Sequence, residues 1–287
     1  MKKPQLNGRA LGLAAALISA NSLAQTTEDP QAIGLDGWNE QPVLTIGEEF
    51  NGYYAPGIPD GMGAFDRGGS VEIISNHELR STQGYPYMLA NGTELTGARI
   101  SSLIIDKDTR QLTDIGPAYD TIYNRAGDIV ESASDLDFGG LNRLWSAGYV
   151  PAGSGGFVDD AFLTGEETYG GSGFILDVAD DTLYAVPWLG RAGWESAAVL
   201  EVPAIAKTHV AIVIGDDRGD AALLLYVGEK KKNGNFLERN GLVNGRLYMW
   251  VADNGDVSPA DWNGTGTSRS GRFVEVENYN AALADPD

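Results

Sequence analysis

Short apolar runs separated by turn-forming residues are the feature that most constrains the fold of this chain. The runs are rich in Val, Ile, Leu, Phe and Tyr, and Gly, Asp, Asn or Pro stand at their ends. The 38 Gly would destabilise helices but suit turns and bulges. The pattern predicts an all-β fold of short antiparallel strands. The expected strands are Val71–Ser75, Ser101–Asp106, Gly173–Val178, Thr182–Val186, His209–Ile214, Ala222–Gly228 and Arg246–Ala252.

The first 24 residues have the pattern of an export signal. Three basic residues precede or flank an apolar stretch, Ala10–Ala20, and the small residues of Ser22–Ala24 fit a signal-peptidase site. The stretch is too short to span a bilayer comfortably, and an uncleaved anchor or a buried helix is the alternative. We expect residues 1–24 to be a signal peptide, no membrane span after its cleavage, and a periplasmic or secreted protein.

Charge and cysteine usage exclude several classes of protein. The chain has 287 residues, with 40 Asp and Glu against 20 Lys and Arg. This negative charge argues against a nucleic-acid partner, because basic patches bind phosphate backbones. With no Cys and two His, the chain cannot form a disulfide scaffold, a thiolate metal site or a multi-histidine zinc site. Its carboxylates suit hard cations such as calcium, and we expect a monomer.

Acidic residues recur at the ends of strand-like segments. Glu167 and Asp217 are 50 residues apart, and Glu78 and Glu167 are 89 apart, close to twice a blade-sized interval. Propeller blades are about 40–50 residues long, and equivalent strand ends face the central channel. The spacing therefore predicts a β-propeller-like domain over residues 25–287, in which these carboxylates converge. Ordinary solvated turns are the alternative explanation of the acidic pairs.

The expected propeller raises the question of ring closure. By blade-length arithmetic the chain holds about four or five blades. A propeller closes on itself to remove its sheet edges. Either the ring is small, or the domain is an incomplete ring truncated at its C-terminus, or a partner completes it.

Local motifs do not identify the chemistry on their own. No phosphate-binding loop, HExxH motif, EF-hand loop or nucleophile elbow occurs in the sequence. Adjacent carboxylates on one strand point to opposite faces, so only one of each pair can enter a given site unless a bulge or turn intervenes. A glycosidase, which needs two carboxylates across a sugar cleft, stays open on this basis.

Several segments in a fixed order, spread from about Glu49 to Tyr248, carry a family resemblance. They are Ser75–Glu78, Thr164–Glu167, Leu189–Glu195, Gly215–Arg218, Leu224–Gly228 and Gly241–Tyr248. In this order the sequence resembles the PhoX-type alkaline phosphatase family. The resemblance implies an exported phosphomonoesterase with a β-propeller fold and a small phosphate-ester substrate. It also implies a carboxylate-bound cluster of calcium and iron in the central channel.

The same resemblance suggests site residues position by position. Glu166 is the first choice as a bridging metal ligand, and Arg191 and Arg218 are the nearest candidates for holding a phosphate through charge-assisted hydrogen bonds. The full set of implied metal ligands is Glu78, Glu166, Glu167, Glu195, Asp216 and Asp217.

Three departures from the family pattern shape the expected function. The family's iron site uses a Cys, which this chain lacks, so calcium alone is expected; Trp194 stands where the family has His, and the chain is shorter. Our first hypothesis is a metal-dependent phosphatase-like protein that hydrolyses phosphate monoesters at a carboxylate-bound calcium site. The alternative is a non-catalytic, calcium-stabilised exported propeller that binds a partner or a polysaccharide.

Overall fold

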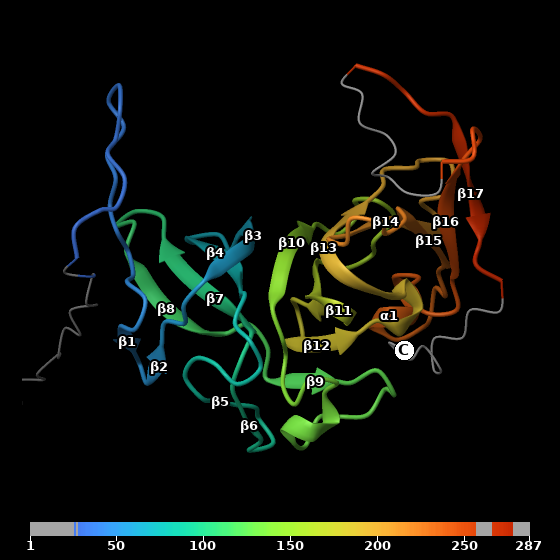
Figure 1. Cartoon of the computed structure of the whole chain (residues 1–287). Coiled ribbons are helices and arrows are strands. Elements are labelled where there is room, and N and C mark those ends of the chain that lie inside the picture. Colours follow the sequence, from blue (N-terminus) through green and yellow to red (C-terminus); the bar gives the residue numbers. More distant parts are fainter. Residues whose placement is uncertain (1–25, 27, 257–265, 278–287) are drawn as a thin grey trace, which may run out of the picture.

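The computed structural model describes residues 26, 28–256 and 266–277 (Figure 1). The expected signal peptide, residues 1–24, lies outside the described residues, so its cleavage stays a prediction. The described part is mostly β, as expected, and its helical elements are α1 (Phe236–Arg239) and the 3-10 turns η1 (Ala133–Asp135) and η2 (Pro187–Leu189). None of the helices in these ranges is long and apolar enough to cross a membrane.

The N-terminal half forms a four-stranded antiparallel sheet. Its order is β3 (Pro59–Asp66), β4 (Ser70–His77), β7 (Arg99–Asp106) and β8 (Leu112–Pro117). Two-residue strands make small hairpins beside it, namely β1 (Glu49–Phe50) with β2 (Tyr53–Tyr54) and β5 (Tyr87–Met88) with β6 (Glu94–Leu95).

The second half forms one continuous nine-stranded sheet, ordered β17-β16-β15-β14-β13-β11-β12-β9, with β10 also paired to β11. Only the β12–β9 pair is parallel among the described strand pairs of this sheet. The members are β9 (Thr121–Tyr123), β10 (Leu144–Val150), β11 (Ala161–Asp177), β12 (Thr182–Ala185), β13 (Arg191–Val199), β14 (His209–Asp216), β15 (Leu224–Glu229), β16 (Arg246–Ala252) and β17 (Gly271–Glu275).

All seven expected strand segments coincide with observed strands, and β11 is much longer than its predicted part. The register of β11 against β13 shifts between Glu167 and Gly171, which marks an irregularity inside this long strand. Figure 1 shows the four-stranded sheet on one side, β13–β17 on the other, and β10–β12 between them. The described strands do not show a closed ring, so propeller closure stays an expectation.

The two halves meet through the close approach of β3 to β10. A Cβ atom on Gly61 would lie 2.2 Å from the backbone nitrogen of Ala147, and one on Gly63 would lie 2.5 Å from Cβ of Tyr149. These separations are too short for any side chain, so glycine at both positions allows the strands to pack backbone against backbone. The contact brings the end of β4 close to β10 and β11, where the candidate site lies.

Two large apolar clusters fill the space around the central strands. One lies between the four-stranded sheet and β10–β12, and the other lies around β11, β13, β14 and α1. Burial of these side chains is the main favourable contribution to folding. Members of the first include Ile74, Ile100, Leu144, Phe162 and Phe174, and members of the second include Trp194, Ile212, Tyr226, Phe236 and Leu242.

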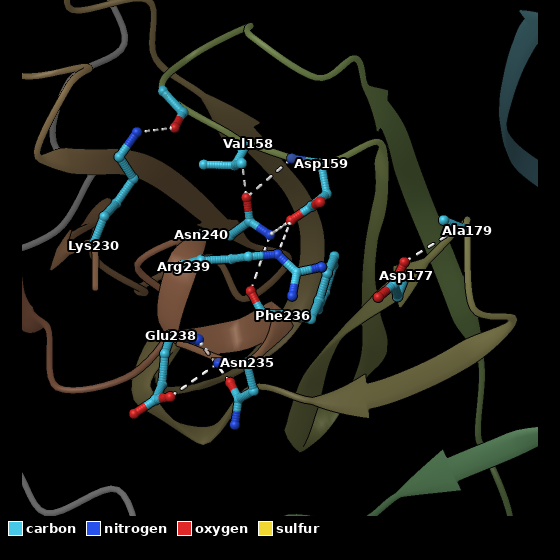
Figure 2. Close-up of polar contacts among 11 residues, drawn as sticks. Val158, Asp159, Asp177, Ala179, Lys230, Asn235, Phe236, Glu238, Arg239 and Asn240 are labelled. Atoms are coloured by element: carbon cyan, nitrogen blue, oxygen red, sulfur yellow. Dashed lines mark hydrogen bonds and ion pairs between the residues drawn. The ribbon is translucent and has the colours of Figure 1, made fainter. Parts of the chain in front are cut away.

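The residue after α1, Asn240, ties that helix to the loop before β11 (Figure 2). Asn240 is fully buried; its Oδ1 accepts from the Val158 nitrogen at 2.7 Å, and its Nδ2 donates to Asp159 Oδ2 at 2.8 Å and to the Phe236 carbonyl at 3.0 Å. Arg239 Nε lies 2.6 Å from the same Asp159 oxygen. These bonds hold the Phe236 ring in the second cluster, where it stacks on Tyr184 at 5.7 Å.

Candidate metal centre

Three carboxylates from three different strands or strand ends converge in the structure. One carboxylate oxygen each of Glu167, Glu195 and Asp217 lies within 4.8 Å of the other two. Glu167 is buried, Glu195 is half-buried and Asp217 is exposed, so the cluster opens to solvent on one side. Among the described residues, this is the group whose acidic and imidazole ligand atoms come close enough to hold a metal ion.

The strand register explains why these three residues meet. Glu167 on β11 pairs with Gly193 on β13, and the Gly193 carbonyl accepts a hydrogen bond from the Asp217 nitrogen at 2.9 Å. The β13–β14 register shifts between Trp194 and Ser196, which makes Glu195 the extra residue of a β-bulge. A bulge re-aims a side chain, and here it accounts for a third carboxylate at the same point.

The side chain of Trp194, on β13, packs against β11 next to the cluster. The residue is 2% exposed, and Cβ atoms on Gly165 and Gly173 would lie 2.3 Å and 2.7 Å from its indole ring. The indole Nε1 donates to the Gly171 carbonyl at 3.0 Å. Trp194 therefore packs inside the sheet and fixes the backbone next to Glu195.

Arg143 joins the cluster to Glu78. Its Nη2 lies 2.9 Å from Glu78 Oε1 and 2.5 Å from Glu167 Oε2. Its backbone is bonded on both sides: the Arg143 nitrogen donates to the Leu79 carbonyl at 2.7 Å, and the Arg143 carbonyl accepts from the Glu167 nitrogen at 2.9 Å. Glu78 thus reaches the site through a guanidinium and is not part of the three-carboxylate group.

The electrostatics of the cluster favour a cation. Burial raises the pKa of Glu167, and the hydrogen-bonding contact with Asp217 raises it further, whereas Arg143 opposes this shift. Burial also raises the pKa of Glu195, with added repulsion from Asp217 and Asp60. Ionised carboxylates that lie this close together repel one another, and a positive ion bound among them would offset this repulsion.

The dimensions of the cluster suit a cation with oxygen ligands, for which calcium gives the scale. Calcium takes oxygen ligands at about 2.3–2.6 Å, so two ligands on opposite sides of the ion are about 5 Å apart. The separations within 4.8 Å found here fall inside that span. Glu167, Glu195 and Asp217 could therefore hold one hard cation.

Glu166 lies in different surroundings from Glu167. It is 2% exposed, and its carboxylate accepts hydrogen bonds from the Asn142 nitrogen at 3.0 Å and the Ser172 nitrogen at 3.1 Å. Burial raises its pKa to about 8 despite these two donors. The structure does not bring Glu166 into the three-carboxylate group, and its expected bridging role stays a prediction.

The two arginines expected to hold phosphate are each bonded to an aspartate. Arg191 Nη1 lies 2.9 Å from Asp137 Oδ2 and donates to the Gly170 carbonyl at 2.7 Å. Arg218 bonds both Asp216 oxygens through Nε and Nη2, at 2.5–3.0 Å, and its Cζ lies 5.3 Å from the Tyr169 ring centroid. Asp216 therefore interacts with Arg218 and is not part of the cluster that holds Asp217.

Two residues near the site, Arg143 and Asp60, could not be found from sequence motifs. Arg143 and Asp60 both lie outside every motif used for the resemblance. Only the packing of β3 against β10 and the β10–β11 pairing bring them close. In the case of Arg143, the partners are at positions 78 and 167, separated from it by 65 and 24 residues.

Comparison with known proteins gave one match of structure and none of sequence. No family model matches the chain, and no curated protein matches it. The chain is similar in structure to Pseudomonas fluorescens PhoX in complex with vanadate, a transition state analogue. The two are 18% identical with a TM-score of 0.46, and the match covers 69% of this chain and 46% of PhoX. The chain thus spans less than half of that protein.

Proposed function

We propose that this protein is a calcium-dependent phosphatase-like hydrolase of phosphate monoesters. The observation that carries the proposal is the convergence of Glu167, Glu195 and Asp217 within 4.8 Å. The ordered acidic motifs, which resemble those of PhoX-type alkaline phosphatases, supply the substrate class. Iron is left out of the proposal because the chain has no Cys. The proposed place of action is the periplasm or the outside of the cell, after removal of residues 1–24.

The three carboxylates would bind the cation, and the strand around them would position it. Glu167, Glu195 and Asp217 would hold the cation from one side and leave its open side toward solvent, where a phosphate ester can approach. The calcium ion, when bound, would supply polarisation of the phosphoryl oxygens and orientation of the attacking oxygen. The β13 bulge and the buried Trp194 hold the backbone of Glu195, so this ligand would be preorganised for cation binding.

The proposal is tested by calcium-dependent turnover and stability measured on the same samples. The chain from Gln25 would be stripped with chelator and assayed for p-nitrophenyl phosphate hydrolysis across pH, with and without calcium, while its melting temperature is recorded. We expect turnover and a higher melting temperature only with calcium, because a ligand of the native state stabilises it. Both effects should be lost in Glu167→Gln and kept in Glu94→Gln, which changes an exposed carboxylate of β6.

The two measurements separate the proposed function from its alternative. A calcium-dependent rise in melting temperature without turnover would contradict the phosphatase proposal and support a non-catalytic, calcium-stabilised protein that binds a partner or a polysaccharide. No response of either activity or stability to calcium would show that the three carboxylates hold no cation.

A further inference from the structure

Arg143 occupies an unusual position beside the three carboxylates. One nitrogen, Nη2, is shared between Glu78 at 2.9 Å and Glu167 at 2.5 Å, and the side chain is 32% exposed. The guanidinium carbon lies 5.9 Å from the ring centroid of Trp145, two residues further along the chain. The positive charge therefore stands at the open edge of the site and contacts one of the three clustered carboxylates.

The backbone at Arg143 is held in a conformation that arginine rarely adopts. Its φ is 48°, in the left-handed region that is unfavourable for a residue with a Cβ. The hydrogen bonds to the Leu79 carbonyl and from the Glu167 nitrogen fix it there. These bonds connect Arg143 to the residue after Glu78 and to Glu167 itself, so the guanidinium is aimed at both carboxylates by the same backbone that positions them.

The hydrogen-bonding capacity of Arg143 exceeds what the protein uses. A guanidinium has five N–H donors, and its Nε is buried with no hydrogen-bond partner among the described residues. Its two ion pairs both involve Nη2. An arginine fork matches the oxygens of a phosphate group in two parallel hydrogen bonds. Because Nε is buried, the fork that an oxyanion at the cation site can meet consists of Nη1, which neither ion pair uses, and of Nη2 once it leaves Glu167.

A cation and Arg143 compete for the same carboxylate. Glu167 is both a member of the three-carboxylate group and a partner of Arg143. A calcium ion bound to the Glu167 oxygens would weaken the ion pair between Glu167 and Nη2 of Arg143. The ion pair with Glu78 would still keep the guanidinium close to the site. The freed donors then lie beside a second positive charge, which is an arrangement suited to a phosphate group.

We propose that Arg143 is the internal counter-ion of the cation-free cluster and the oxyanion-binding residue of the cation-loaded site, so that calcium binds before phosphate. This inference rests on the proposed function, because it uses the same three-carboxylate cation site. It assigns the phosphate contact to Arg143 rather than to Arg191 or Arg218. Because coupling between two ligands is reciprocal, calcium should tighten phosphate binding and phosphate should tighten calcium binding by the same factor.

The test measures the binding of two probes, calcium and inorganic phosphate, by calorimetry on the chelator-treated protein. Phosphate would be titrated at concentrations below those at which calcium phosphate precipitates. In the wild type, phosphate binding should depend on calcium. In Arg143→Gln, calcium affinity should be unchanged or higher because its competitor is gone. Phosphate affinity of the calcium-loaded form should fall about 10- to 100-fold, as expected for loss of charge-assisted hydrogen bonds.

Two further variants complete the design. Arg143→Lys keeps the charge without the planar fork and should lose part of the phosphate affinity, which keeps the inference testable if Arg143→Gln does not fold. Arg67→Gln is the matched control, since Arg67 also pairs with a glutamate, Glu72, at 2.6 Å but lies in the β3–β4 turn. It should leave both affinities unchanged.

The outcomes distinguish this inference from the proposed function. Absence of calcium binding by the wild type would overturn both. Calcium binding that requires Glu167, together with a phosphate affinity that Arg143→Gln leaves unchanged, would overturn only the role of Arg143. A fall in calcium affinity in Arg143→Gln without a change in phosphate binding would show that Arg143 merely supports the fold of the site, and would overturn it too.

Discussion

Glu166 and Glu167 are adjacent in the sequence, yet their carboxylates have different surroundings. The Glu166 carboxylate accepts two backbone N–H groups, from Asn142 and Ser172, whereas the Glu167 carboxylate contacts Arg143 and belongs to the three-carboxylate group. Alternation of side chains along a strand explains the difference, because neighbouring residues of β11 point to opposite faces. Glu167 therefore lies in the candidate metal centre, and the Glu166 carboxylate is buried on the other face of the strand.

A first prediction compares the two members of this pair. Glu167→Gln should abolish the calcium-dependent rise in melting temperature, a stabilisation of about 2.7 kcal/mol at a calcium concentration 100 times the Kd. Glu166→Gln should keep it, because burial raises the pKa of Glu166 to about 8 and a neutral Gln resembles the protonated carboxyl. Thermal unfolding with and without calcium measures both effects. Equal loss in the two variants would instead support Glu166 as a ligand.

The pattern of apolar runs and turns was enough to predict the strands but not the site. Strand segments such as Val71–Ser75 and His209–Ile214 follow from local composition, and the structure has them as parts of β4 and β14. The acidic motifs named Glu167, Glu195 and Asp217 among the candidates, and the structure brings these three carboxylates close together. What they could not show is which member of each acidic pair faces the cluster, since that depends on register.

Non-local packing explains the remaining differences. The bulge at Glu195 and the contact of Arg143 with Glu78 arise from strands that are distant in the sequence, and no local propensity encodes them. Arg191 and Arg218 were candidates on motif position alone, and the structure shows each of them bonded to a nearby aspartate. Ring closure of the expected propeller is likewise a property of the whole assembly of sheets and not of any one segment.

A second prediction concerns the tryptophan beneath the candidate site. Trp194→His should lower the free energy of unfolding by about 2–4 kcal/mol, because it leaves a cavity against Gly165 and Gly173 and removes the indole bond to the Gly171 carbonyl. Urea unfolding measures the change. Trp38→His, at a side chain that is 81% exposed, is the control and should have little effect. Unaltered stability in Trp194→His would show that this packing does not hold β13 in place.

A third prediction concerns the link between α1 and the loop before β11. Asn240→Ala should lower the free energy of unfolding by about 2–4 kcal/mol, because the fully buried Asn240 side chain bonds three groups at once, and its loss removes the bonds to the Val158 nitrogen, the Asp159 carboxylate and the Phe236 carbonyl. Asn235→Ala removes only the N-cap bond to the Glu238 nitrogen and should cost about 1 kcal/mol. Chemical denaturation of both variants checks the order of the two costs, and a larger loss in Asn235→Ala would refute it.

A fourth prediction concerns the pH dependence that Asp177 confers on stability. Asp177 is 4% exposed, and its Oδ1 accepts from the Ala179 nitrogen at 3.1 Å (Figure 2). Burial raises its pKa above the ordinary value of 3.8, and the negative charge of Asp159 adds to this shift, while the Ala179 N–H and Arg239 oppose it. Because the folded state binds this proton more tightly than the unfolded state, the contribution of Asp177 to stability is fully present below pH 3.8 and is lost as the pH rises through the raised pKa.

Asp177→Asn should therefore make the protein more stable than the wild type at neutral pH, since an amide oxygen can still accept from the Ala179 nitrogen and no charge has to be buried. The gain should shrink as the pH falls through the raised pKa and should vanish below pH 3.8, where the carboxyl is protonated in both states. Chemical denaturation at a series of pH values measures it, with Asp180→Asn as the control at a neighbouring exposed position. If the difference between Asp177→Asn and the wild type stayed constant across the series, ionisation of Asp177 would not be its cause.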